Sequence, residues 1–203
     1  MIGRSISLLL LLLVMPGRSV LAEEATAPAD PSELEAAQAS ADEAFESEQY
    51  TEAHDIYRDR LAPIGDKFAQ YMIAAMHLQG LGVPQDVPLG AAWLELAAER
   101  GDAKLGAERD AVLARLDDNE RKRQQSLLKE LQASFSDCTL VARGLAEDRK
   151  NVTAMTGSRL ATTENSPLTV VYLDEREGEI SQVELREQIR KRQRFLREYC
   201  DYR

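Results

Sequence analysis

The stretch FAQYMIAAMHLQGLGVPQDVPLGAAWLELAAERGD, from Phe68 to Asp102, decides the fold of this chain. Two segments with apolar residues at helical spacing flank a Gly-Leu-Gly-Val-Pro turn, and the stretch ends in Ala-Ala-Glu-Arg-Gly-Asp. Apolar residues that recur every three to four positions predict amphipathic helices, and the glycines and proline between them predict a turn. The stretch is therefore predicted to form a helical hairpin, which must bury one face against a neighbouring hairpin.

Further helices are predicted on both sides, and together they define a helical domain over residues 32–135. Ser32 and Asp117 each stand three residues before a Glu, a pattern that caps the free amides of a helix start. Pro88 suits a first helical turn, and Gly101 suits a helix end. The expected helices cover residues 32–48, 50–61, 66–79, 88–100, 103–116 and 117–135.

The chain also repeats itself at a shift of 36 residues. The shift superposes an aromatic residue, small residues and a turn: Tyr57 on Trp93, Leu61 on Ala97, Ala62 on Ala98, Gly65 on Gly101 and Asp66 on Asp102. A helix–turn–helix unit with a period of this size is typical of solenoids, in which each hairpin packs on the next. The sequence therefore predicts a mainly α fold, a short α/α solenoid.

The central stretch resembles the Sel-one-like repeat, a variant of the tetratricopeptide class with a longer loop between its helices. The matching residues are Ala69, Gly80, Gly82, Val83, Asp86, Trp93, Ala97, Ala98 and Gly101. The chain departs from the family pattern at Ala74 (Gly in the pattern), His77 (Tyr) and Gly90 (Ala). Residues 33–65 resemble a degenerate preceding repeat, and residues 102–116 resemble a following half. The resemblance implies an α/α solenoid that binds proteins or peptides on its concave face, and it implies no enzyme.

Structural roles are expected for the matching residues. Gly80 and Gly82 permit a tight, left-handed exit from a helix. Ala97 and Ala98 let neighbouring helices approach closely, while Trp93 fills the space between hairpins. Ala69, Asp86 and Gly101 complete the set of repeat-structural residues.

Residues 1–22 are predicted to be a secretory signal peptide. Met-Ile-Gly-Arg precedes an apolar run from Ile6 to Met15, and Val20-Leu-Ala22 supplies small residues for cleavage after Ala22. The run is too short for a membrane-spanning helix, which needs about 20 residues, and no Cys follows it to carry a lipid. Residues 23–31 are predicted to be a flexible leader. We therefore expect a periplasmic or secreted protein without a transmembrane span.

The formal net charge of the chain is −10. Such a charge argues against binding nucleic acid, because a polyanion would be repelled. The two cysteines, Cys138 and Cys200, are expected to form a disulfide in an oxidising compartment; two free buried thiols are the alternative.

Residues 136–203 are predicted to form a small α+β appendage. Residues 151–156 (NVTAMT) and 168–173 (LTVVYL) contain β-branched residues between turn formers, which favours two short strands. A last helix is expected over residues 181–200. A disulfide would tie this helix to the end of the sixth helix.

The sequence contains no recognisable catalytic motif, and no catalytic residue, cofactor or metal is expected. The only histidines, His54 and His77, lie on predicted helices without the spacing of a zinc site. His77 occupies a packing position of the family pattern, at the core or at the edge of a groove. The last helix is basic, and its Arg190 and Arg194, together with His77, are candidate interaction residues. The alternative for this cluster is pairing within the chain, such as Glu187 with Arg190 or Lys191.

These observations favour an exported, non-catalytic adaptor that binds a protein or peptide of the bacterial cell envelope. An envelope hydrolase or cell-wall-modifying enzyme is the first alternative, and a structural subunit of a larger assembly is the second. Because a few hairpins bury only a modest core, a homo-oligomer is also plausible.

Overall fold

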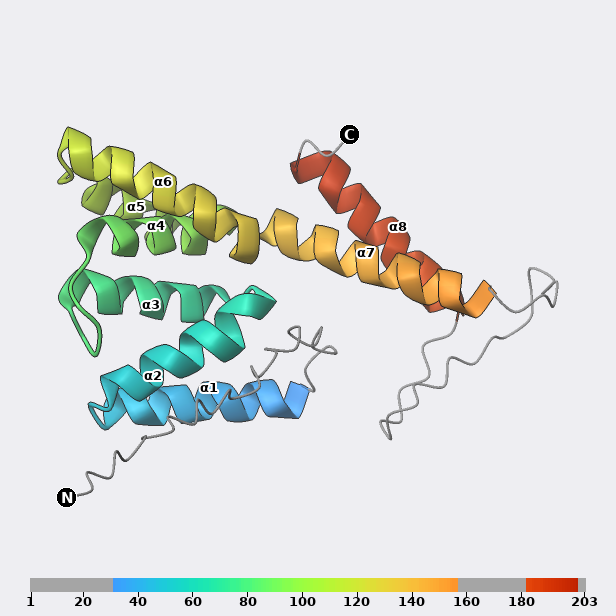
Figure 1. Cartoon of the computed structure of the whole chain (residues 1–203), viewed down its shortest axis with the longest axis horizontal. Helices are drawn as coiled ribbons and strands as arrows, with labels where there is room; N and C mark the ends of the chain where they lie inside the picture. Colours follow the sequence, from blue (N-terminus) through green and yellow to red (C-terminus); the bar gives the residue numbers. More distant parts are fainter. Residues whose placement is uncertain (1–30, 157–181, 201–203) are drawn as a thin grey trace, which may run out of the picture.

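The computed structural model describes residues 31–156 and 182–200. Regular structure within these residues is helical throughout (Figure 1). The α-helices are α1 (Pro31–Glu46), α2 (Tyr50–Ile56), α3 (Lys67–Gln79), α4 (Val87–Ala97), α5 (Ala103–Leu113), α6 (Asp118–Phe135), α7 (Asp137–Thr156) and α8 (Gln182–Tyr199). Short helices stand at two corners: a π-helix η1 (Tyr57–Leu61), followed by a 3-10 helix η2 (Ala62–Ile64), and a 3-10 helix η3 (Ala98–Arg100).

Helices α1 to α6 stack as successive hairpins, which confirms the predicted α/α solenoid (Figure 1). Helix α1 packs on α2, α3 packs on α4, and α4 also packs on α6. The core of the stack is built from small and aliphatic residues with two large aromatic ones. Its fully buried side chains include Ala41, Ala53, Tyr57, Ile73, Leu94 and Leu96.

The 36-residue repeat predicts two structurally equivalent corners, and both are present. Gly65 and Gly101 each end a 3-10 turn in the left-handed conformation, with φ of 84° and 80°. The following residues, Asp66 and Asp102, each begin the next helix by accepting a hydrogen bond from the backbone N–H three positions later. Such caps satisfy amides that a helix start leaves free. The 36-residue repeat in the sequence therefore corresponds to a repeat of the turn geometry.

Two other predicted helix starts can be compared with the structure. Asp117 forms the full capping box with Glu120, as the sequence indicates. Helix α1 instead begins at Pro31, so Ser32 lies inside the helix and not at its N-cap. Pro31 is tolerated there because the first helical amide needs no partner.

The predicted strand over residues 151–156 is wrong, because these residues form the last turns of α7. Residues 137–150, to which the sequence assigned no element, form the rest of this helix. Val and Thr cost only a few tenths of a kcal/mol per residue in a helix, so a long helix already formed extends through them. The second predicted strand, over residues 168–173, lies outside the described residues.

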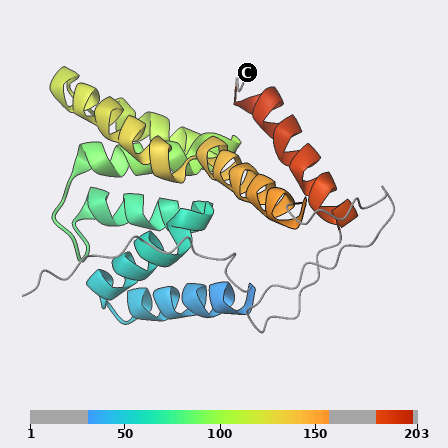
Figure 2. The same ribbon diagram turned by 45° about the vertical axis from the view of Figure 1, so that its right-hand side comes forward.

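Helix α8 runs back along α7, so the described part of the appendage is a helical hairpin (Figures 1 and 2). Leu145 of α7 and Leu185 and Leu196 of α8 are buried. Arg192 of α8 donates a 2.6 Å hydrogen bond to the carboxylate of Asp148 on α7. The predicted helix over residues 181–200 is therefore confirmed for its described part.

The predicted signal peptide over residues 1–22 and residues 23–30 of the predicted leader lie outside the described residues. Within the described ranges, no helix combines the length and the apolar character that a membrane crossing requires.

The loop glycines of the repeat offer a direct test of this packing. Gly82 has a φ of 69°, and a Cβ there would lie 2.4 Å from the backbone carbon of Tyr50 and 2.5 Å from the backbone nitrogen of Thr51. Gly101 has a similar φ of 80°, but a Cβ there meets nothing within 4 Å. We expect Gly101→Ala to cost about 1 kcal/mol of unfolding free energy, the conformational penalty alone. Gly82→Ala should cost about 3 kcal/mol, because the α2–α3 side of the stack must also move.

Urea unfolding of the two variants, followed by circular dichroism, measures the difference. Equal costs for the two substitutions would show that the loop does not press on α2.

Candidate functional site

The residues that match the repeat pattern lie where neighbouring helices meet. Ala69, Ala97 and Ala98 are buried at the α3–α4 end, and Trp93 is only 4% exposed. The Trp93 ring lies against Phe135 of α6, with 5.0 Å between the ring centroids. Gly80 ends α3 in the left-handed conformation, as expected for a tight exit. These residues shape the stack, and the burial of Ala69, Trp93, Ala97 and Ala98 leaves these four no free surface for a ligand.

Asp86 links the repeat to the next hairpin. Its carboxylate accepts the backbone N–H of Leu89 at the start of α4, and both its oxygens accept hydrogen bonds from Arg123 of α6, at 2.9 and 2.6 Å. Partial burial opposes ionisation of this carboxyl, but the Arg123 bonds outweigh it and hold the pKa of Asp86 below its usual value. Asp86 is therefore a structural anion that fixes α6 on α4.

His54 of α2 and His77 of α3 form an edge-to-face pair, with 5.3 Å between the ring centroids. His54 Nδ1 lies 3.5 Å from Asp55, and Nε2 of His54 and Nδ1 of His77 are buried without a hydrogen-bond partner. Burial is the main cause that lowers the pKa of both rings. Burial therefore favours the uncharged form of both rings, which pack on each other at the boundary between α2 and α3.

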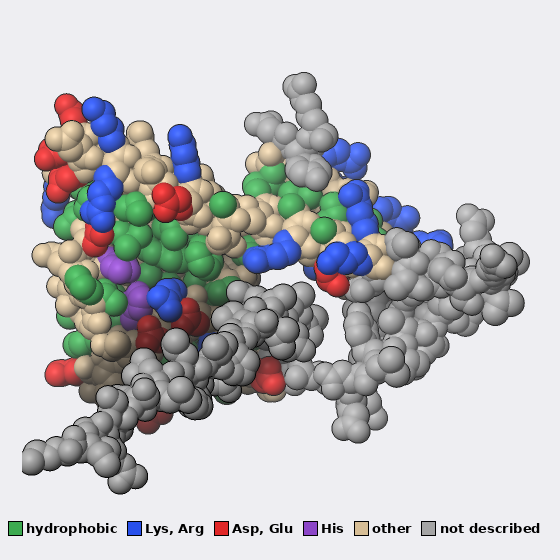
Figure 3. Space-filling model, viewed as in Figure 1, with side chains coloured by type: hydrophobic (Ala, Val, Ile, Leu, Met, Phe, Trp, Pro, Cys, Tyr) green, Lys and Arg blue, Asp and Glu red, His purple; other side chains and the backbone are tan. Residues whose placement is uncertain are grey.

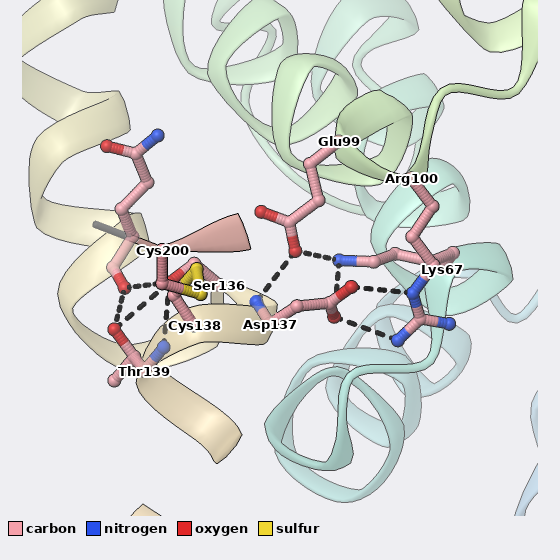
Figure 4. The surroundings of a disulfide bond; sticks show 9 residues. Lys67, Glu99, Arg100, Ser136, Asp137, Cys138, Thr139 and Cys200 are labelled. Carbon is pink, nitrogen blue, oxygen red and sulfur yellow. Dashed lines mark hydrogen bonds and ion pairs between the residues drawn. A yellow bond between two sulfur atoms is a disulfide. The ribbon is translucent and has the colours of Figure 1, made fainter. Parts of the chain in front are cut away.

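A cluster of Lys67, Glu99, Arg100 and Asp137, here named the junction cluster, joins the repeat to α7 (Figure 4). Arg100 donates to both carboxylate oxygens of Asp137, at 2.7 and 2.8 Å, and Lys67 lies 3.2 Å from the same carboxylate. Lys67 also pairs with Glu99, which in turn accepts the backbone N–H of Asp137 at 2.7 Å. Burial opposes ionisation of Asp137, but the bond from Arg100 and the charge of Lys67 hold its pKa below the usual range. The cluster thereby fixes the first turn of α7 on α3 and η3.

A disulfide lies next to this cluster, and its Cys138 directly follows Asp137 in the chain (Figure 4). Cys138 of α7 and Cys200, which follows α8, are joined as a disulfide with their Cα atoms 5.8 Å apart. The pairing expected from the sequence is therefore present, and it ties the end of α8 to the start of α7. Neither cysteine of this pair is available as a thiol nucleophile.

A cavity of about 470 Å³ lies where the solenoid meets α7. It is lined by Arg58, Asp59, Pro63, Ser134, Phe135 and Arg143. Arg58 is bound in bidentate fashion to Asp59, at 2.7 and 3.0 Å, whereas Arg143 donates only a 3.3 Å bond to the backbone carbonyl of Ser134. An acidic group beside an apolar side chain fits this lining, because guanidinium groups bind carboxylates and Phe135 and Pro63 offer apolar contact.

The sequence did not identify these lining residues. They come from η1, η2, α6 and α7, and no local motif groups them. His77, the candidate from the repeat stretch, does not line the cavity. Figure 3 instead shows the histidine side chains at the edge of a hydrophobic area on one face of the stack.

Arg190 and Arg194, the other candidates, lie on the exposed side of α8, away from the cavity. Lys and Arg side chains gather along α7 and α8 (Figure 3). Glu187 pairs with Lys191, as the intramolecular interpretation of the basic cluster expects, but not with Arg190.

Among the described residues, no group of three or more His, Cys, Asp or Glu side chains is placed to hold a metal ion. Asp59, the acid in the cavity lining, is held by Arg58, and this contact is the first cause that keeps its pKa low. A carboxylate in such a pair is a weak proton acceptor, so the cavity is better suited to binding than to acid–base chemistry.

The histidine pair predicts a stability change near neutral pH. In the unfolded chain both rings bind protons with a pKa near 6.5, whereas in the folded chain burial lowers both values. Stability should therefore be full above pH ~6.5 and should fall as the pH drops below it, because the unfolded state then binds more protons. Thermal unfolding between about pH 7.5 and 5.5, a range above the usual pKa of carboxyl groups, measures this loss.

The double variant His54→Leu with His77→Tyr is the matched control and should show a clearly shallower pH dependence. An unchanged slope in this variant would assign the pH dependence to other groups.

Comparison with protein families matches residues 67–102 to the Sel1 repeat. The match covers α3, the loop with Gly80 and Gly82, α4 and the following corner. No curated protein and no solved structure shows significant similarity to the chain. The repeat match and the helical stack around it agree: residues 67–102 are similar to the Sel1 repeat, and they form one helical hairpin of the solenoid.

Proposed function

We propose that this protein is an exported, non-catalytic adaptor of the bacterial cell envelope that binds a protein or peptide partner. Sel1 repeats indicate a scaffold for protein interaction, and such scaffolds are generally non-catalytic.

The cavity at the junction of the solenoid with α7 is the observation that carries the proposal. Phe135 lines the cavity and also packs on Trp93 of the repeat, so the cavity adjoins the core of the stack. Arg143 and Pro63 also line the cavity. A partner segment with an acidic side chain beside an apolar one would bind there by charge and by apolar contact.

Two features support export. The first 22 residues have the order of a secretory signal peptide, with a basic start, an apolar run and a small-residue exit. The disulfide between Cys138 and Cys200 is of a kind that persists in oxidising compartments. The net charge of −10 makes nucleic acid an unsuitable partner.

The alternative of an envelope hydrolase has less support. A hydrolase needs an acid or a histidine with a free proton-accepting atom in a cavity. Here the cavity acid Asp59 is bound to Arg58, and the histidine pair lies outside the cavity lining. The second alternative, a structural subunit, does not compete with the adaptor, because it would use other surfaces of the same scaffold.

Site-specific photo-crosslinking in the envelope tests the adaptor proposal. Ser134, an exposed residue of the cavity lining, would be replaced by p-benzoylphenylalanine, and Lys122, an exposed residue of the same helix outside the lining, provides the control position. We expect one discrete protein adduct from position 134 and none from position 122.

Adding Arg143→Glu should remove the adduct, because the substitution places a negative charge where the acidic group of the partner binds. Adducts that are the same at both positions, or that persist with Arg143→Glu, would contradict binding at this cavity.

A further inference from the structure

Four arginines form a stripe along the exposed side of α8, here named the arginine stripe: Arg186, Arg190, Arg194 and Arg197. Their spacing of four, four and three residues places them on one face of the helix. All four are exposed, and none forms an ion pair with another residue in the described parts of the chain. Neighbouring guanidinium groups that form no ion pair repel each other, so the stripe favours an anionic partner.

The remaining cations of α8 hold the stripe in place. Lys191 pairs with Glu187 at 3.0 Å along the helix, and Arg192 pairs with Asp148 of α7 at 2.6 Å. Leu185 and Leu196 are buried on the other side of α8, and the disulfide fixes its end. Because α8 is already ordered, it loses little additional conformational freedom when a partner binds to the stripe.

The same chain contains a complementary surface at its other end. Helices α1 and α2 together contain seven acidic residues and no Lys or Arg. Glu35, Glu43 and Glu46 are exposed on α1, and each lacks an ion-pair partner in the described parts of the chain. Glu35 and Glu46 are 11 residues apart, and so are Arg186 and Arg197. The acidic residues of α1 and the arginine stripe therefore each extend over about 16 Å of helix. The acidic α1 face and the arginine stripe are therefore equal in length and opposite in charge.

A contact between these two surfaces within one molecule is prevented by the fold. In Figures 1 and 2, α7 lies between α8 and α1. The arginine stripe is made of exposed residues of α8, whereas the helix packs on α7 through another side that includes the buried Leu185 and Leu196. The stripe therefore faces away from the acidic hairpin of its own chain.

We propose that the arginine stripe of one molecule docks on the acidic α1 face of a second copy. Two such contacts related by a two-fold axis would close a dimer, in which both copies use both surfaces. The contact is mainly electrostatic, so it is weak and sensitive to salt. It does not involve the cavity at the solenoid–α7 junction, so the dimer and partner binding can succeed or fail independently.

Sedimentation equilibrium of the purified, oxidised protein tests this proposal. We expect a dimer at about 20 mM salt and at least a roughly tenfold weaker association at about 500 mM salt, where the screening length falls several-fold. The variant Arg190→Glu with Arg194→Glu should be monomeric at low salt. The control variant Arg115→Glu with Lys122→Glu has the same change of charge on exposed residues of the solenoid and should dimerise like the unaltered protein.

A charge exchange separates the specific contact from a general effect of charge. Glu43→Arg with Glu46→Arg should also be monomeric alone, and mixing it with the arginine variant should restore a heterodimer through the reversed charges. Circular dichroism confirms that each variant is folded before it is used. A monomer at low salt, or a mixture that does not associate, would overturn the proposal. Binding of the monomeric protein to phosphatidylglycerol vesicles through the same arginines would also overturn it, since the stripe would then serve a lipid surface.

Discussion

The close packing of α4 between α3 and α6 is the constraint on which the other contacts depend. Helix α4 buries both small and large residues around its circumference: Pro88, Gly90, Ala91, Ala92, Trp93, Leu94, Leu96 and Ala97. At Gly90 a Cβ would lie 2.7 Å from Leu78 and 3.0 Å from the carbonyl oxygen of Ala74, so α3 approaches the backbone of α4 directly. The family pattern places Gly at position 74 and Ala at position 90, the reverse of this chain. The two departures are therefore neighbours across one interface, and the single methyl group has moved from α4 to α3.

The junction cluster connects this packed repeat to the C-terminal part of the chain. Asp137 is held by Arg100 and Lys67 of the repeat, and Cys138 follows it directly in α7. The cluster fixes the start of α7, and the disulfide fixes the end of α8 to the same point. One corner of the Sel1 repeat therefore determines where the cavity at the solenoid–α7 junction and the arginine stripe are presented.

Local signals in the sequence predicted most of the solenoid. Asp66, Asp102 and Asp117 begin helices as their patterns indicate, and Gly65 and Gly101 end the equivalent turns. The secondary structure beyond the repeat was harder to predict from the sequence, because residues 151–156 combine β-branched side chains with a position at the end of a long helix. There the extension of a long helix outweighs the local preference for a strand. The cavity lining could not be predicted, since Arg58 and Arg143 are brought together only by the way that the hairpins stack.

Native-state hydrogen exchange tests most directly whether the packing of α4 is the basis of the fold. If α4 packing is the basis of the fold, amides of α3 and α4 should exchange only through global unfolding, and those of α5 and α8 should exchange earlier. Reduction of the disulfide, which closes a loop worth about 4 kcal/mol in the chain-entropy model, should speed exchange in α8 and leave α3 and α4 unchanged. Greater protection in α7 and α8 than in α3 and α4, or a loss of protection in α3 and α4 on reduction, would contradict it.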